Sequence, residues 1–224
     1  MKRFLLLLSF IISFYADGVY ATQGLALKGG LNIAWTKLSA LNSSVEHGPT
    51  AGLNTHFAYR KGPWSLDLSS YINFSGFTGL DLKAQGIQIS NVDGDVRNIA
   101  FAPLIKYYTD YEPKPAWNMY FGIGPTWSLL TMKLDEDLTG QGFGPEDKFV
   151  YESQGGSIVI GIEEKTLHKE MHPVYFEFMF QYLKSHELTT VDARNTAETI
   201  IVSKEEIRQI ESLYYIISMG ITIF

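Results

Sequence analysis

The segment from Trp117 to Leu129 constrains the fold of this chain more than any other. Its odd-numbered residues are mostly apolar, and its even-numbered residues are small, polar or tyrosine. An alternation of period two is typical of a β-strand with one apolar and one polar face. Trp117 and Trp127 both lie on the apolar face, and the ten residues between them climb about 25 Å in a tilted strand. That height matches the apolar band of an outer-membrane β-barrel, whose two water–lipid interfaces favour tryptophan.

The N-terminus predicts export from the cytoplasm. A basic pair is followed by an apolar run over residues 4–15 and by small residues before a cut near Ala21, which is the pattern of a secretory signal. We therefore expect a signal peptide at 1–21 and one β-barrel domain at 22–224. A short uncleaved anchor is the alternative, and the shortness of the apolar run disfavours it.

Composition excludes several other classes of protein. The chain has 224 residues, a formal net charge of −6 and no cysteine, so thiol catalysis and thiolate metal sites are excluded. Outside the N-terminus no apolar run reaches the roughly 18 residues that a membrane helix needs. The mild acidity and the lack of a basic stripe disfavour nucleic acid as a partner.

Eight segments show the alternation of a strand, and their connections are alternately long and short. The predicted strands are 25–35, 50–60, 64–75, 96–108, 117–129, 149–163, 174–182 and 213–224. The predicted long loops are 36–49, 76–95, 133–148 and 185–206, of which 76–95 could be partly extended. This arrangement predicts an all-β fold, an eight-stranded antiparallel up-and-down transmembrane β-barrel with short periplasmic turns and long external loops. Trp64 and Trp117 would form one aromatic girdle, and Trp35 and Trp127 the other.

Glycine, proline and acidic residues predict local irregularities. Pro103 and Pro125 each remove a backbone donor, so we expect gaps in strand pairing there. The pair Gly155 and Gly156 predicts a β-bulge, and residues 93–95 (Asp-Gly-Asp) predict a turn. The segment from Thr199 is either the top of a strand or the start of a short helix capped by Ser203 and Glu206.

This layout resembles the small eight-stranded outer-membrane barrel proteins of Gram-negative bacteria, a group that includes the OmpA transmembrane domain, OmpX and OmpW. The resemblance covers residues 22–224 and includes the C-terminal segment ending in Phe224. It implies that the barrel-assembly machinery reads Phe224 as an assembly signal. It also implies outer-membrane lipid as a partner and an outer-membrane location.

Polar residues on the inward face predict a network inside the barrel. The set comprises Lys28, Asn32, His56, Arg60, Asp67, Lys106, Glu163, Glu177 and Gln181. An eight-stranded barrel is just wide enough for its side chains to fill it, and buried charges must be paired. We expect these residues to plug the lumen, and a narrow pore or ligand path is the alternative.

Two groups of residues could suggest catalysis or metal binding. Ser185, His186 and Glu187 are the residue types that a lipid A deacylase on an eight-stranded barrel uses, but neighbours on a strand point to opposite faces and cannot form a triad. The acidic residues of 135–147 match no calcium loop. We therefore expect no catalytic residues, no metal and no cofactor.

The function predicted from the sequence is non-enzymatic, with a structural or surface-interaction role carried by four external loops. A narrow channel for small or hydrophobic molecules, as the OmpW resemblance would allow, is the first alternative, and a lipid A-modifying enzyme is the second. A soluble barrel of lipocalin type is the architectural alternative, but it would need an apolar interior. The external partner has no signature in the sequence.

Overall fold

A computed structural model describes most of the chain beyond its first residues. The described residues are 24–40, 43–84, 87–109, 117–135, 148–164, 172–191, 199–201 and 210–223. The predicted signal peptide and its cleavage site, Ser203, Glu206 and the terminal Phe224 lie outside these residues. Within the described part of the chain, no helix is long and apolar enough to cross a membrane.

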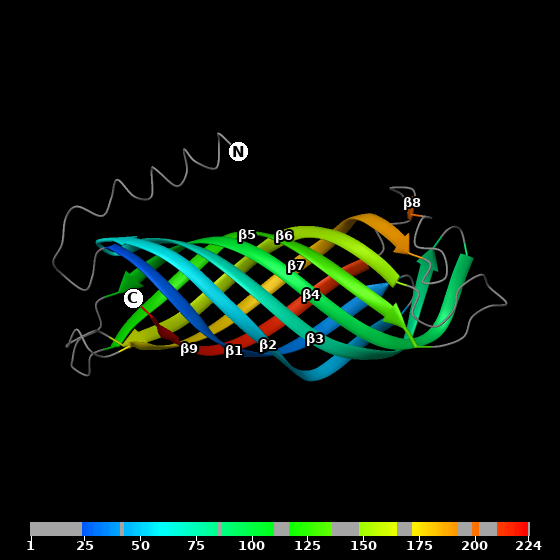
Figure 1. Ribbon diagram of the computed structural model, residues 1–224, viewed down its shortest axis with the longest axis horizontal. Coiled ribbons are helices and arrows are strands. Elements are labelled where there is room, and N and C mark those ends of the chain that lie inside the picture. The colour runs from blue at the N-terminus through cyan, green and yellow to red at the C-terminus, as the bar shows by residue number, and fades with distance from the viewer. Residues whose placement is uncertain are drawn as a thin grey trace.

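Nine strands are described, and eight of them are long (Figure 1). Their bounds are β1 Gly24–Ala40, β2 Ser43–Lys61, β3 Trp64–Ala84, β4 Ile87–Thr109, β5 Trp117–Leu134, β6 Lys148–Glu164, β7 Val174–Val191, β8 Thr199–Ile201 and β9 Ile210–Thr222. All eight predicted strands are present. Residues 199–201 form the short strand β8, as one alternative for this segment expects, and the helix expected at Ser203 and Glu206 lies outside the described residues.

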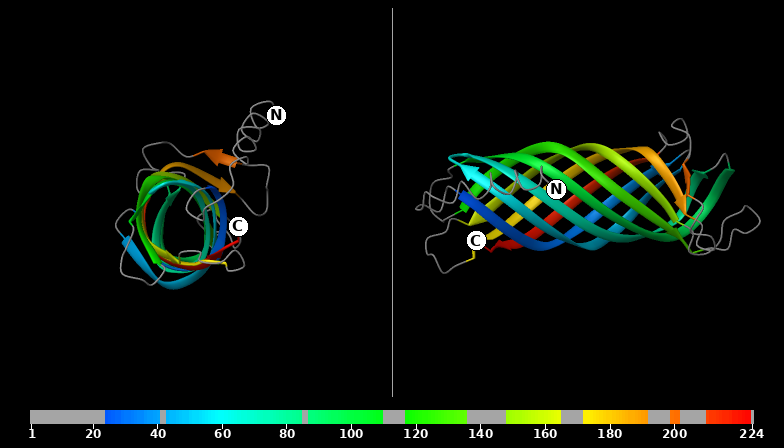
Figure 2. Two further views of the ribbon diagram at one scale, coloured as in Figure 1. Left: turned by 90° about the vertical axis from the view of Figure 1, so that its left-hand side faces the viewer. Right: turned by 45° about the horizontal axis from the view of Figure 1, so that its top comes forward.

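The eight long strands close into an antiparallel ring. Each of β1 to β6 pairs with the next strand in sequence. The ring then closes because β7 pairs with β9 and β9 pairs with β1. The view along the barrel in Figure 2 shows the closed ring, with β8 added outside it against the end of β7. The predicted up-and-down barrel is therefore confirmed.

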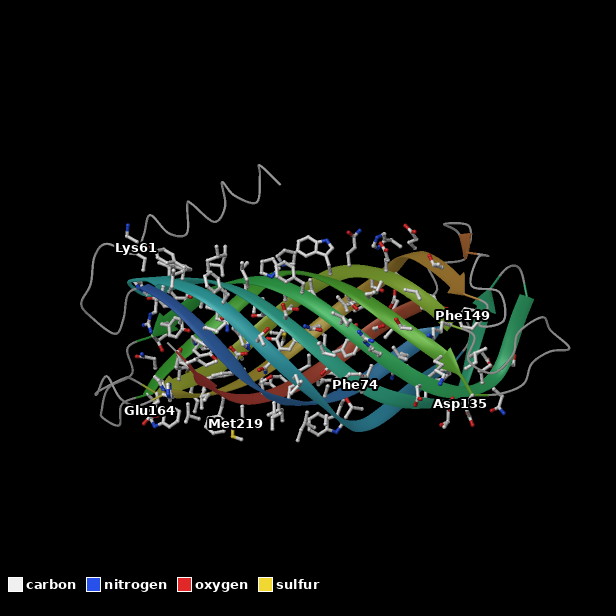
Figure 3. All side chains as sticks on the ribbon, viewed as in Figure 1. Lys61, Phe74, Asp135, Phe149, Glu164 and Met219 are labelled. Carbon is white, nitrogen blue, oxygen red and sulfur yellow. The ribbon has the colours of Figure 1, made fainter. Side chains whose placement is uncertain are left out.

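The two faces of the wall carry the residue types that the alternation predicts. Leu31, Leu53, Ile123 and Met219 are among many large apolar side chains that are exposed on the outside. The opposite face contains the buried residues, both polar and apolar (Figure 3). An apolar exterior around a partly polar interior is the arrangement of a barrel that faces lipid, and it excludes the lipocalin alternative.

Three predicted loops are wholly or partly continuations of strands. The alternative that 76–95 is partly extended is thereby confirmed, and the expected loop 185–206 begins later than predicted because β7 continues to Val191. The loop expected at 36–49 is the top of a β1–β2 hairpin, in which pairing continues until Ala40 faces Ser43. The loop expected at 76–95 is mostly a β3–β4 hairpin that pairs until Ala84 faces Ile87. The turn expected at 93–95 is wrong for the same reason, because all three residues lie within β4, and Gly94 and Asp95 pair with β3 and with β5. We call this end of the barrel the hairpin end, and the opposite end, which contains the turn at Gly62, the short-turn end.

A seam opens in the wall between β2 and β3 toward the hairpin end. Pairing between these two strands stops where Gly52 faces Asn73, although each strand continues and stays paired with its other neighbour. Gly48 and Pro49 together lie opposite the single residue Trp35, which is a β-bulge. A bulge bends its strand, and proline cannot donate to a neighbouring strand. These two features explain why β2 leaves β3.

Proline and glycine shape the wall between β4, β5, β6 and β7. Pairing of β4 with β5 is interrupted between Phe101 and Ile105, so the predicted gap at Pro103 and Pro125 is confirmed. The bulge predicted at Gly155 and Gly156 is wrong, because both glycines are paired in register. A Cβ atom on Gly155 would lie 1.8 Å from the Tyr182 carbonyl oxygen, so this glycine allows a close approach of two strands.

Candidate functional site

A cluster of charged side chains lies inside the barrel, in the half nearer the short-turn end. Lys106 on β4 forms ion pairs with Asp67 on β3, at 2.7 Å between Nζ and Oδ2, and with Glu177 on β7. His56 on β2 contacts Asp67 at 3.2 Å from its Nδ1, and Tyr120 on β5 donates a hydrogen bond to Glu177 at 2.8 Å. All five side chains are buried. We call these five residues the central cluster.

A second group of charges lies beside the central cluster at the short-turn end. Lys28 on β1 forms an ion pair with Glu163 on β6 at 2.7 Å. The Tyr108 hydroxyl donates to Glu163 at 3.0 Å, and so does the hydroxyl of Thr222. The Arg60 guanidinium carbon lies 3.9 Å from the centroid of the Tyr108 ring. The negative face of the ring attracts the positively charged guanidinium group. The cluster and this group join strands from all round the ring.

The structure places all nine predicted network residues on the inner face, and seven of them belong to the two charged groups. Asn32 and Gln181 are buried but do not join either group. The Asn32 amide has no hydrogen-bond partner among the described residues, and Gln181 donates to the Met179 sulfur at 3.1 Å.

The interior also contains residues that the predicted set omitted. Tyr108 and Tyr120 connect the carboxylates across the barrel, and Tyr175 donates to Asn54 at 2.8 Å. All of these positions lie on the polar side of the alternation, so the sequence already indicated that their side chains face inward. An apolar core surrounds them, including Ala102, Leu104, Val159, Met179, Leu183 and Ile216. The filling is therefore mixed rather than wholly polar.

Three residues of the central cluster could in principle hold a metal ion. His56, Asp67 and Glu177 each offer a ligand atom, and these atoms lie within 4.8 Å of one another. Lys106 contacts both carboxylates, however, so an ammonium group already supplies the positive charge that this acidic pair needs. A second cation at that place would be repelled by Lys106, and the lack of a metal therefore remains our prediction.

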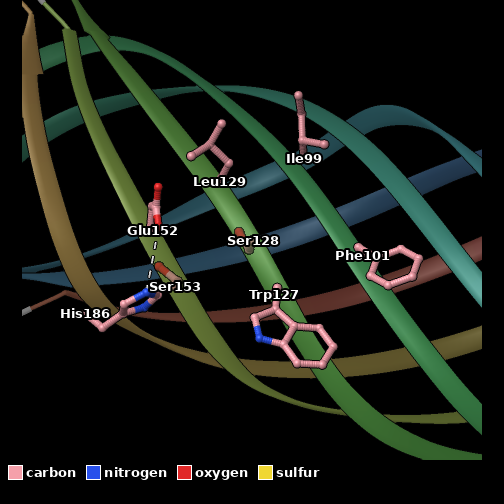
Figure 4. Close-up of a pocket in the computed structure, with 8 residues that line it drawn as sticks. All are labelled: Ile99, Phe101, Trp127, Ser128, Leu129, Glu152, Ser153 and His186. Atoms are coloured by element: carbon pink, nitrogen blue, oxygen red, sulfur yellow. Dashed lines mark ion pairs between the residues drawn. The ribbon is translucent and has the colours of Figure 1, made fainter. Parts of the chain in front are cut away.

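A pocket of about 300 Å³ opens on the outside of the barrel wall (Figure 4). It is lined by Ile99, Phe101, Trp127, Ser128, Leu129, Glu152, Ser153 and His186. His186 forms an ion pair with Glu152 at 3.8 Å, and both side chains are about half exposed. Ser185 points inward, where it hydrogen-bonds Ser153 at 3.0 Å. Ser185 and His186 thus lie on opposite faces of the wall, as the alternation predicted, and do not form the serine–histidine pair of a hydrolase.

The four tryptophans lie on the outer face at two levels. Trp64 and Trp117 are the first residues of β3 and β5, at the short-turn end. The ring centroids of Trp64 and Tyr107 lie 4.9 Å apart, and those of Trp117 and Phe176 lie 6.2 Å apart. Trp127 lies ten residues further along β5 and stacks with Phe101 at 6.5 Å. Trp35 is near the top of β1, beside the bulge in β2. This placement fits two aromatic girdles, and their contact with a membrane interface remains a prediction.

Among solved structures, the chain resembles several outer-membrane barrels at low sequence identity. Outer membrane protein OprG from Pseudomonas aeruginosa aligns with a TM-score of 0.52 and 14% identity, covering 90% of this chain and 97% of that one. The outer membrane protease OmpT from Escherichia coli aligns at 0.49 and 9%, covering 92% and 98%. Neisserial surface protein A aligns at 0.45 and 9%, covering 92% and 99%.

No known family profile and no curated protein matches the chain. The similarity to OprG therefore establishes the class of fold, which is that of an outer-membrane β-barrel. The resemblance inferred from the sequence is confirmed at this level. A shared fold does not by itself assign a role.

Proposed function

We propose that this protein resides in the outer membrane of a Gram-negative bacterium and is a non-enzymatic scaffold that presents β-hairpins at the cell surface. The exposed apolar wall supports the location, because side chains such as Leu31 and Ile123 would be costly to leave in water. The two levels of tryptophan support it too. Its partners in the membrane would be lipid and, during biogenesis, the barrel-assembly machinery.

The hairpin end would face the exterior of the cell. Strands are connected by the short turn at Gly62 at one end and continue into the long β1–β2 and β3–β4 hairpins at the other. Bacterial outer-membrane barrels have short turns on the periplasmic side and long connections outside. The hairpins would thus stand above the girdle of Trp35 and Trp127.

The two unpaired strand edges at the seam carry the proposal of surface interaction. Above Gly52 and Asn73, β2 and β3 each have one side without a strand partner among the described residues. Such an edge presents free backbone donors and acceptors, which can pair with an extended segment of another protein. Both edges lie at the hairpin end, where an external partner would reach them.

A hairpin replacement tests the surface role. Residues 78–93 would be replaced with a flexible Gly/Ser segment of equal length, which preserves the chain length but removes most of the unpaired edge of β3. We expect cells that express the wild-type protein to aggregate or to adhere to coated surfaces, and the variant to lose at least most of that binding. The measurement is sedimentation and surface retention of cells with matched expression.

Fold must be separated from function in this test. A closed barrel stays folded in detergent until heated and then changes its gel mobility, so the variant should show that heat-dependent shift in the outer-membrane fraction. A variant that folds but binds as well as the wild type would contradict the role of the β3 edge. Recovery of the wild type in the soluble periplasm would contradict the location itself.

We also expect the lumen to be closed to ions. The central cluster joins β2, β3, β4, β5 and β7 across the interior, and buried apolar side chains such as Leu104 and Ile216 fill the space beside it. An eight-stranded barrel leaves little room beyond its own side chains. Purified protein in a planar lipid bilayer should therefore give no stable conductance steps, and regular steps would favour the channel alternative.

A further inference from the structure

We propose that the pocket on the outer wall binds a single-chain amphiphile with an ammonium head group, by accepting the ammonium at Glu152 and packing the alkyl chain on Phe101 and Trp127. This inference depends on the proposed outer-membrane location, because it places the pocket at the external edge of the lipid. Such a pocket would bind one kind of amphiphile, whereas the rest of the outer wall would contact any lipid.

A β-bulge places the histidine in this pocket. Ser153 faces Ser185 and Glu152 faces Glu187, so His186 is an extra residue on β7 with no partner in β6. Bulges bend the strand and redirect a side chain, and they are frequent next to functional sites. Here the extra residue points outward and meets Glu152 (Figure 4). The bulge thus places the imidazole 3.8 Å from a Glu152 carboxylate oxygen, which is beyond hydrogen-bond distance and leaves that carboxylate able to accept from a ligand.

The other side of the pocket is apolar and continues the lipid-facing wall. Ile99, Phe101, Trp127 and Leu129 come from β4 and β5, and the two aromatic rings stack against each other. The volume of about 300 Å³ is at the lower end of the range for small-molecule sites. Such a space suits part of one alkyl chain with its head group, rather than a whole multi-chain lipid.

The charges around the pocket favour a cationic head group. Glu152 is the register partner of Glu187, so two carboxylates come from facing positions of β6 and β7, and Glu152 is the one that lines the pocket. The nearest ammonium on β7, that of Lys184, is already paired with Glu211 at 3.0 Å. The residues that line the pocket include one carboxylate and neither lysine nor arginine, so the lining favours a cationic head group over an anionic one. Trp127 adds an aromatic face, to which cations are attracted.

Calorimetric titration of the purified barrel in an uncharged detergent tests the site. The probes are dodecylammonium and, as the anionic counterpart with the same chain, dodecyl sulfate, both below their micellar concentrations. We expect one saturable site for dodecylammonium and none for dodecyl sulfate. Glu152→Gln should weaken dodecylammonium binding by about tenfold or more, because a hydrogen bond to a charged group is lost.

The matched control is Glu164→Gln, which removes a carboxylate from the same strand at the short-turn end and does not line the pocket. It should bind the ammonium probe within about twofold of the wild type, because a charge at the far end of the strand is screened by salt. Equal binding by Glu152→Gln and wild type, or equal binding of both probes, would overturn the proposal. Heat-dependent gel mobility of each variant, together with cell fractionation, reports separately whether the barrel and its location are as proposed.

Discussion

Replacing Lys106 with methionine should lower the free energy of unfolding by about 3–5 kcal/mol, the cost of leaving buried charges without their partner. Lys106 is fully buried and is the ammonium that contacts both Asp67 and Glu177. Methionine has a similar length but no charge, so two carboxylates would face each other inside the barrel. The shift in the urea midpoint of unfolding in detergent micelles, followed by gel mobility, measures the effect.

Lys184→Met is the matched control for this prediction. Lys184 also pairs with a glutamate, Glu211, at 3.0 Å, but both side chains are largely exposed. Exposed pairs contribute about 0–1 kcal/mol, so this variant should unfold close to the wild type. If Lys106→Met were equally benign, the central cluster would not hold the strands together. A double variant that also carries Glu177→Gln should recover part of the lost free energy of unfolding, because it removes one of the two carboxylates left without a cation.

Gly155→Ala should also impair the barrel strongly, although it adds only one methyl group. The added Cβ atom would lie 1.8 Å from the Tyr182 carbonyl oxygen and 2.9 Å from the Leu183 Cα atom. Both contacts are with backbone, which cannot rotate away. The strands β6 and β7 must separate locally, at a cost of about 1–3 kcal/mol or more for overpacking. We expect slower assembly and a lower unfolding midpoint.

The adjacent glycine provides the control. A Cβ atom on Gly156 would meet nothing closer than the Gly124 carbonyl oxygen at 3.7 Å, which is an ordinary contact. Gly156→Ala should therefore be neutral or stabilise by about 0.4–1 kcal/mol, because alanine reduces the freedom of the unfolded chain. Similar behaviour of the two variants would mean that β6 and β7 do not approach at Gly155 as described.

The membrane-spanning part of the fold was predictable because each strand there has two different environments. In β5 the alternation begins at Trp117, the residue at which the strand begins. Lipid on one side and a partly polar interior on the other impose a pattern of period two. The gap at Pro103 and Pro125 followed from a missing donor. These features depend on local chemistry that the sequence displays directly.

The hairpins were not predictable in the same way. Residues 36–49 and 76–95 lie beyond the apolar wall, where both faces of a strand can be polar and the alternation disappears. Their strand structure comes from pairing with a neighbour, as when Leu38 faces Val45, rather than from an apolar face. The bulge at His186 was missed for a related reason, because it depends on the register between β6 and β7.

The candidate sites were predictable only in their orientation. Alternation placed Asp67, Lys106 and Glu177 inside the barrel, and the structure agrees. It could not pair them, because Lys106 and Glu177 come from strands that are not neighbours in the ring. It also could not join Glu152 with His186, which are distant in sequence and meet through the bulge.

The seam between β2 and β3 makes the surface of this protein modular. Above Gly52 and Asn73 the two hairpins share no backbone pairing, so an insertion or deletion in one leaves the register of the other unchanged. A mutation that lengthens the β1–β2 hairpin would thus leave the pairing of β3 unchanged, and one that lengthens the β3–β4 hairpin would leave the pairing of β2 unchanged. The two hairpins can therefore change in length one at a time, while the closed wall below them keeps its register.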